Sequence, residues 1–143
     1  MYASSGMLGT KSGGSIASAW AVLRHLGDDG YTTLVQQTRK ATEQLADHIA
    51  AHQHLVLRVY PDSTLICFGA QDPSVLNVFA VADELRVRGW YVDRQTPPDS
   101  LHCTVNAIHH DKIDAFVVDL DASIELVLST RLSGDVGSYG NLE

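Results

Sequence analysis

Residues 55–68, Leu-Val-Leu-Arg-Val-Tyr-Pro-Asp-Ser-Thr-Leu-Ile-Cys-Phe, decide the fold. Before this stretch the apolar residues recur every three or four positions, which is typical of amphipathic helices. Within it, Leu55–Tyr60 and Thr64–Phe68 are short runs rich in β-branched and aromatic residues. Pro61-Asp62-Ser63 between the runs has the composition of a turn. The stretch therefore predicts a β-hairpin that follows helical sequence.

The flanking sequence predicts four helices and a second hairpin. Asp72-Pro73 supplies an N-cap acceptor followed by a first-turn proline, and Gly89 is placed to end the same helix. Before the first hairpin, the expected elements are a helix over 16–26, a turn over 27–30 and a helix over 31–51. After it, they are a helix from 72 to 88 and strands over 90–93 and 101–105 joined at Pro97-Pro98. A last helix, capped by Asp111, carries apolar residues from Ile113 to Val127. The order ααββαββα predicts an α+β fold with two layers, in which helices cover a mostly antiparallel four-stranded sheet.

Composition indicates one globular domain. The chain has 143 residues, of which 45% are hydrophobic, and 10 Lys+Arg against 17 Asp+Glu give a net charge of −7. We expect a glycine- and serine-rich loop over 1–15, a single α+β domain over 16–131 and a flexible tail over 132–143. The acidic balance argues against a nucleic-acid partner, and no apolar run approaches the ~20 residues of a membrane span. With two cysteines and no signal-peptide pattern, a cytoplasmic location is expected.

The loop before the first helix has two interpretations. Its glycines, with Thr10, Lys11 and Ser12, could bring donors to an anion at the start of the helix. It is not a P-loop, because Thr10 and not glycine precedes Lys11. The alternative is a flexible leader that ends in a capping serine.

Histidines and cysteines are the other candidates for chemistry. His48 and His52 are four residues apart near the end of a helix, and His54 follows. That spacing can bind a metal, but no carboxylate or thiol completes the set nearby in the sequence, so we expect a solvated helix end and no metal site. His102 is expected on a sheet face, and Cys67 and Cys103 as reduced strand residues that could be neighbours.

Several short motifs together resemble one enzyme family. They are the Gly9–Gly14 loop, Leu26–Tyr31, Arg88-Gly89-Trp90, Pro97–His102, Ala107-Ile108-His109 and Gly137–Gly140. In this order they resemble the segment after the cofactor lysine in sphingosine-1-phosphate lyase and related group II decarboxylases, which depend on pyridoxal phosphate. The resemblance covers nearly the whole chain.

The resemblance implies the small C-terminal domain of a fold-type-I pyridoxal-phosphate enzyme. Its partners would be a large cofactor-binding domain or subunit and a second copy of the enzyme. Gly9, Thr10 and Lys11 would approach the cofactor phosphate of the neighbouring subunit, and Tyr2 and Tyr139 would lie near the substrate. The parent reaction would be carbon–carbon cleavage or decarboxylation next to an amine.

The resemblance also implies that this chain is inactive alone and has no catalytic residue of its own. Its only lysines are Lys11, Lys40 and Lys112, and none follows the family's Asn/Asp-x-His-Lys pattern for the cofactor imine. Ser5 and Ser12 stand where the lyases commonly have proline, and Lys11 where arginine is usual, which leaves the substrate open. The strand and helix order alone also allows a stand-alone ββαββα ligand-binding or regulatory module without catalytic activity.

Overall fold

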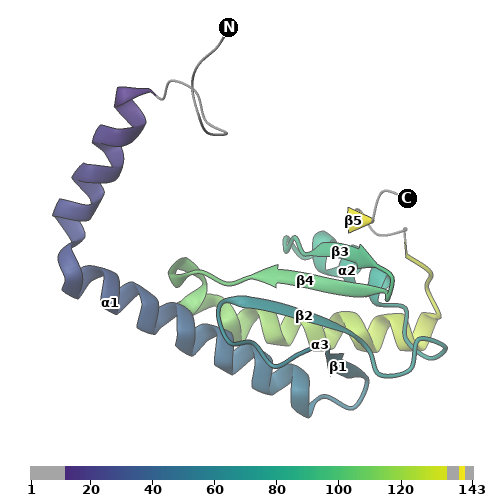
Figure 1. The fold of residues 1–143 in the computed structure, drawn as a ribbon. Coiled ribbons are helices and arrows are strands. Elements are labelled where there is room, and N and C mark those ends of the chain that lie inside the picture. Colours follow the sequence, from purple (N-terminus) through teal and green to yellow (C-terminus); the bar gives the residue numbers. More distant parts are fainter. Residues whose placement is uncertain (1–11, 135–138, 141–143) are drawn as a thin grey trace, which may run out of the picture. The chain divides into compact units, whose positions relative to one another are not determined.

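The structure is a computed structural model that describes residues 12–134 and the backbone of 139–140. The chain divides into two units, residues 1–34 and 35–143. The described elements, in chain order, are α1 (Gly13–Ala51), β1 (Leu55–Leu57), β2 (Leu65–Ala70), α2 (Val78–Val87), β3 (Asp93–Thr96), β4 (Ser100–Thr104), the 3₁₀ helix η1 (Ala107–Lys112), α3 (Ile113–Thr130) and β5 (Tyr139–Gly140) (Figure 1).

One sheet organises the second unit, with the strand order β1-β2-β4-β3-β5. Strands β1 to β4 pair antiparallel with their neighbours, which confirms the predicted α+β fold and its four-stranded antiparallel sheet. The two-residue strand β5 adds to β3 in parallel, with Tyr139 opposite Gln95. The sequence did not predict this fifth strand. The expectation of a flexible tail over 132–143 stays a prediction, because most of those residues lie outside the described ones.

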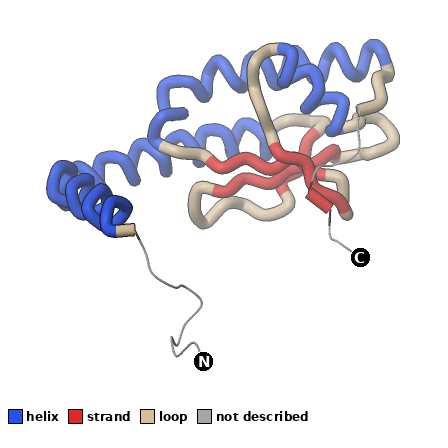
Figure 2. Tube along the Cα trace, turned by 90° about the horizontal axis from the view of Figure 1, so that it is seen from above, coloured by secondary structure: helices blue, strands red, loops and turns tan. Residues whose placement is uncertain are grey.

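The strand register sorts the side chains onto two faces. Phe68 pairs with Leu101 and Ile66 with Cys103, so these four share one face. That face is buried: Ile66, Phe68 and Leu101 expose no measurable surface. Within residues 35–134, Figure 2 shows the helices gathered on one side of the strands. The other face of β2 and β4 carries alternate residues, among them Cys67, which pairs with His102.

Helices supply the second layer of the core. From residue 41 onward the buried residues of α1 recur every three or four positions: Ala41, Thr42, Leu45, Ala46 and Ile49. Leu85 of α2 and Leu120 and Ile124 of α3 are buried in the same core. The two-layer arrangement follows from these apolar stripes meeting the apolar face of the sheet.

The break in the first helical segment is shorter than the predicted turn. Helical structure continues through Asp28, Asp29 and Gly30, and only Gly27 has non-helical angles, φ 58° and ψ −173°. This region of backbone space is essentially restricted to glycine. Helical bonding therefore resumes one residue after Gly27, and the prediction of a four-residue turn was wrong.

The predicted start of α2 was also wrong. Asp72 accepts the Ser74 backbone N–H at 2.9 Å and forms an isolated turn. The N-cap is Asn77, whose Oδ1 accepts from the backbone N–H groups of Phe79 and Ala80 at 2.9 and 3.1 Å. At the other end Gly89 has φ 92°, as its predicted place just after the helix requires.

Two further boundaries differ from the prediction. The strand expected over 90–93 lies at 93–96, because the Trp90 backbone N–H still bonds to Leu85 O at the end of α2. Asp111 does not cap α3, since it belongs to η1, which runs directly into that helix. Among the described residues, no helix is both long and apolar enough to cross a membrane.

Candidate functional site

The residues that the sequence assigned to cofactor and substrate are outside what the structure describes. Tyr2, Gly9, Thr10 and Lys11 belong to the residues before position 12. Tyr139 is described only through its backbone in β5. Their contacts with a phosphate or a substrate therefore stay predictions.

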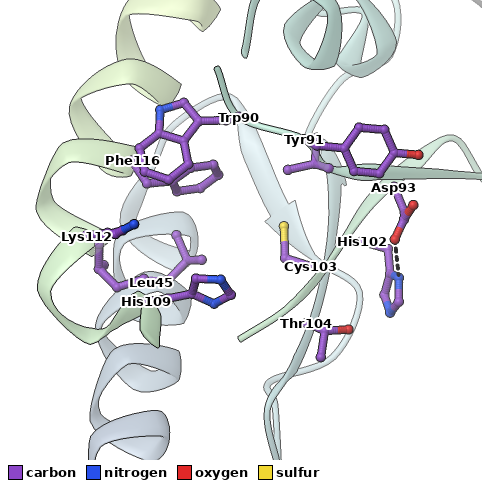
Figure 3. Close-up of a pocket in the computed structure, with 12 residues that line it drawn as sticks. Leu45, Trp90, Tyr91, Asp93, His102, Cys103, Thr104, His109, Lys112 and Phe116 are labelled. Atoms are coloured by element: carbon purple, nitrogen blue, oxygen red, sulfur yellow. Dashed lines mark ion pairs between the residues drawn. The ribbon is translucent and has the colours of Figure 1, made fainter. Parts of the chain in front are cut away.

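A cavity of about 240 Å³ opens where β3, β4, η1 and α3 come together, and we call it the Trp90 cavity (Figure 3). Its apolar lining comes from both layers of the fold: Leu45, Trp90, Val92, Cys103, Ile113 and Phe116. Its polar lining comes from η1, from β3 and β4 and from the residues just before β3: Tyr91, Asp93, His102, Thr104, His109 and Lys112. The sequence did not predict this cavity, because its lining is drawn from segments as far apart in the chain as Leu45 and Phe116.

Aromatic packing fixes one wall of the Trp90 cavity. The rings of Trp90 and Phe116 meet edge to face, with their centroids 5.2 Å apart and an interplanar angle of 83°. The Trp90 indole N–H donates to Asp119 Oδ2 at 2.7 Å. Because the polar end of the indole is satisfied outside the cavity, its ring presents a fixed apolar surface.

The polar groups of the cavity lie on two sides. In Figure 3, His109 and Lys112 stand on the same side as Phe116, and His102 and Asp93 stand across from them. His109 Nδ1 accepts the backbone N–H of Asn106 at 3.0 Å. In the neutral ring the proton is therefore on Nε2, which makes Nε2 a donor. His102 Nδ1 is 4.0 Å from Asp93 Oδ2, and the strand register places both side chains on the face of the sheet opposite Cys103.

Cys103 lies between these two sides as a neutral thiol. Burial, with smaller contributions from Asp93 and Cys67, raises the pKa of Cys103 to about 12. The thiolate is the nucleophilic form of cysteine, so this side chain acts as an apolar group at neutral pH. Cys67 and Cys103 are both free, as expected, and the strand register puts them on opposite faces of the sheet.

A second polar cluster surrounds Arg58 on the other face of the sheet. Arg58 Nε donates to Ser100 Oγ at 2.8 Å, and Nη2 donates to Asp99 O at 2.7 Å. A Cβ at Gly69 would collide with this guanidinium and would lie 2.8 Å from Asp99 O. The glycine therefore allows the arginine to cross the strand, and the guanidinium is held in one orientation.

The histidines of α1 meet a carboxylate that the local sequence does not contain. Asp121 of α3 places Oδ1 2.8 Å from His48 Nε2 and 3.9 Å from His52 Nε2. Burial lowers the pKa of His52, although Asp121 opposes this effect. The prediction of a merely solvated helix end was wrong in this respect. Within residues 12–134, no group of three or more His, Cys, Asp and Glu side chains is arranged to hold a metal ion.

The described residues do not make up a complete site for pyridoxal phosphate. They include two lysines: Lys40 is exposed on α1, and Lys112 stands at the rim of the Trp90 cavity. The loop to which the resemblance assigns the phosphate, residues 9–11, is not among them. The part of the chain that is described supports no chemical step through this cofactor.

Comparisons of sequence give relatives with known names. Sphingosine-1-phosphate lyase from Arabidopsis thaliana is 28% identical over 127 residues, which are 89% of this chain and 23% of the lyase. The probable L-tyrosine/L-aspartate decarboxylase of Methanothrix thermoacetophila is 29% identical over 129 residues, which are 90% of this chain and 31% of that protein. No family model matches the chain. The chain thus spans less than a third of the length of either relative.

The comparison of structures agrees with these matches. The solved sphingosine-1-phosphate lyase of Burkholderia pseudomallei superposes with a TM-score of 0.77 at 26% identity, over 88% of this chain and 28% of the lyase. The fold is that of the C-terminal domain of this lyase. The resemblance expected from the sequence is therefore confirmed: the chain is similar to a short portion of pyridoxal-phosphate lyases and decarboxylases.

Proposed function

We propose that this chain is the small C-terminal domain of a pyridoxal-phosphate-dependent carbon–carbon lyase or decarboxylase of the sphingosine-1-phosphate lyase type. Its role is to complete an active site whose cofactor is held by a large domain or subunit. The chain alone is inactive, because the cofactor imine requires a lysine that its sequence does not place in the family motif.

One observation carries this proposal. The match to the Burkholderia lyase combines sequence identity with a shared fold, over 88% of the chain. A fold alone does not imply a function. Here the identity of 28% to the Arabidopsis lyase extends over 127 residues and supports common descent with that family as well.

Within the proposed enzyme, the loop before α1 contributes to the cofactor site of a neighbouring subunit. Gly9 and Thr10 would offer backbone and hydroxyl donors to the cofactor phosphate, and Lys11 would offer a positive charge. Tyr2 and Tyr139 would lie near the substrate. The enzyme would be a homo-oligomer located in the cytoplasm.

The first test asks whether the chain alone holds the cofactor. The purified chain is mixed with an equal concentration of pyridoxal phosphate, treated with borohydride and analysed by mass spectrometry. We expect no stoichiometric adduct at Lys11, Lys40 or Lys112 and no turnover of an amine substrate. Stoichiometric labelling of one lysine, or turnover by the chain alone, would contradict the proposal.

The second test supplies the missing part. The DNA upstream of Met1 is examined for a large α/β domain with a His-Lys motif, and the two pieces are expressed together. We expect the pair to bind pyridoxal phosphate and the Lys11→Ala variant to bind it more weakly, with Lys40→Ala as the matched control. Binding that is equally strong for both variants would remove Lys11 from the phosphate site.

The Trp90 cavity favours a second candidate, a ligand-binding or regulatory module without catalytic activity. A partly enclosed space lined by apolar groups and a few polar ones is typical of small-molecule sites. If the chain is such a module, we expect the gene to begin at Met1 and the DNA upstream to encode no large α/β domain. The upstream sequence therefore distinguishes the two candidates.

A further inference from the structure

We infer that the Trp90 cavity binds a small aromatic monocarboxylate, with its ring against Trp90 and Phe116 and its carboxylate at His109 and Lys112. This inference is independent of the proposed enzyme. It concerns residues that neither the resemblance nor the comparisons assign to any site.

The apolar wall determines the body of the ligand. Phe116 and Ile113 are buried, and the Trp90 ring is held by its hydrogen bond to Asp119. A planar ring can pack against this edge-to-face pair. The volume of about 240 Å³ sets the size, since a dry cavity of about 150 Å³ already accepts benzene. One ring with a short side chain fits, and a drug-sized molecule does not.

The side formed by η1 determines the charge of the ligand. Lys112 carries a positive charge at the rim, and the His109 ring is oriented by Asn106 so that Nε2 can donate. A carboxylate accepts both kinds of hydrogen bond, and bonds of this charge-assisted type are stronger than neutral ones. The neutral Cys103 thiol adds no repulsion at physiological pH.

The rest of the cavity limits the ligand to a single negative charge. On the side of the sheet that carries Cys103, the lining apart from His109 and Lys112 is formed mainly by apolar groups, because Asp93 and His102 share the opposite face with Cys67. A second carboxylate on the ring would be buried among these apolar groups without a charged partner in this lining, which is unfavourable. The arrangement therefore favours a monocarboxylate over a dicarboxylate of the same size.

The test uses phenylpropionate as the probe and Trp90 as the reporter. The chain contains two tryptophans, so the Trp20→Phe variant leaves Trp90 as the only one. We expect phenylpropionate to change the fluorescence of Trp90 in a saturable way. Phenylpropionamide, which lacks the charge, should bind about tenfold more weakly. Propionate, which lacks the ring, should give no saturable change. Equal affinity for the acid and the amide would overturn the inference.

Two variants locate the binding. Lys112→Gln should lower the affinity for phenylpropionate about tenfold. Lys40→Gln, at an exposed lysine of α1, should leave this affinity unchanged. Cys103→Phe should fill the cavity and abolish binding, whereas Cys67→Ala on the other face of the sheet should not.

Circular dichroism checks that Cys103→Phe is folded. If Cys103→Phe is not folded, His109→Gln is used in its place, because this variant removes the imidazole donor. It should weaken the binding of phenylpropionate but not that of phenylpropionamide. Unchanged affinity in both Lys112→Gln and the folded second variant would place the probe elsewhere and overturn the inference.

Discussion

Asn77 is the residue on which the start of α2 depends. Its side-chain oxygen accepts two backbone N–H groups of the first turn, from Phe79 and Ala80. Asn77→Ala leaves both donors without this partner and should lower the free energy of unfolding by about 1 kcal/mol. Urea denaturation followed by circular dichroism measures the change.

A matched variant tests the capping explanation. Asn77→Asp keeps an acceptor at the same place and adds a charge that the helix N-terminus favours, so its stability should stay close to that of the parent chain. If Asn77→Ala and Asn77→Asp lose equal stability, packing and not capping is the role of Asn77.

Cys103 gives the molecule a dependence on alkaline pH. Its pKa is about 12 in the fold, against an ordinary value of 9.0. As the pH rises above 9, the unfolded chain loses the thiol proton first, so the equilibrium shifts toward the unfolded state. The stability that the neutral buried thiol contributes is present at neutral pH and decreases as the pH rises from about 9 toward 12.

The prediction is a smaller loss of stability at high pH in Cys103→Ala. Urea midpoints of the parent chain and the variant are compared at neutral pH and at about pH 10. The quantity to compare is the change with pH, since removing the side chain also alters packing. Cys67→Ala is the control and should keep most of the parent's pH dependence. Parallel curves for Cys103→Ala and the parent chain would contradict this account.

At the scale of elements, the break in α1 depends on a single glycine. Gly27 has a backbone conformation that is essentially closed to alanine. In Gly27→Ala the backbone should return to helical angles, because alanine has the highest helix propensity. We expect helical Cα chemical shifts at residue 27 and a stronger helical signal in circular dichroism.

Gly13→Ala is the control for this prediction. It makes the same chemical change at the start of α1, where a Cβ would meet nothing within 4 Å. It should leave the chemical shifts at residue 27 unchanged. If Gly27→Ala keeps non-helical shifts at that position, the break has a cause other than the glycine.

Periodicity predicted the kinds of element well and some of their boundaries poorly. The hairpins and the apolar stripes of α1 and α3 follow directly from spacing. Asp72-Pro73 has the composition of a helix start, yet it forms a separate turn, and Asn77 begins the helix. Trp90-Tyr91-Val92 has high β-propensity, but Trp90 packs against Phe116 and the ladder starts at Asp93. Tertiary packing overrode local preference at Trp90, whereas at Asp72-Pro73 the cap supplied by Asn77 decided where the helix starts.

The candidate sites could not be predicted in this way, because they join distant parts of the chain. His48 and Asp121 are 73 positions apart, and Arg58 and Ser100 are 42 apart. Spacing along one element gives no information on such pairs. The resemblance pointed instead to Tyr2, Gly9, Thr10, Lys11 and Tyr139, whose side chains the structure does not describe.

At the scale of the whole molecule, the first unit exposes an apolar helix face. Ile16, Trp20 and Leu23 of α1 are 60%, 64% and 56% exposed. Contiguous apolar surface of this kind promotes association. We expect the purified chain to be a dimer or a larger species by light scattering.

Substitution of this face should reverse the association. Trp20→Lys combined with Leu23→Lys should shift the chain toward the monomer, because two charges would have to be buried in the contact. Val118→Lys on α3, at another exposed apolar residue, is the matched control and should not. A monomeric parent chain at high concentration would show that the exposed face does not drive association.

The ends of the sheet limit what form such association can take. The outermost described strands are also the two shortest, with three residues in β1 and two in β5. At a long edge, the unpaired main-chain N–H and C=O groups can pair with a strand from another molecule. A short edge exposes few such groups, so this kind of pairing is weak. Copies of this chain should therefore join through side chains into bounded assemblies. Growth into fibrils that stain with thioflavin T is not expected while the fold is intact.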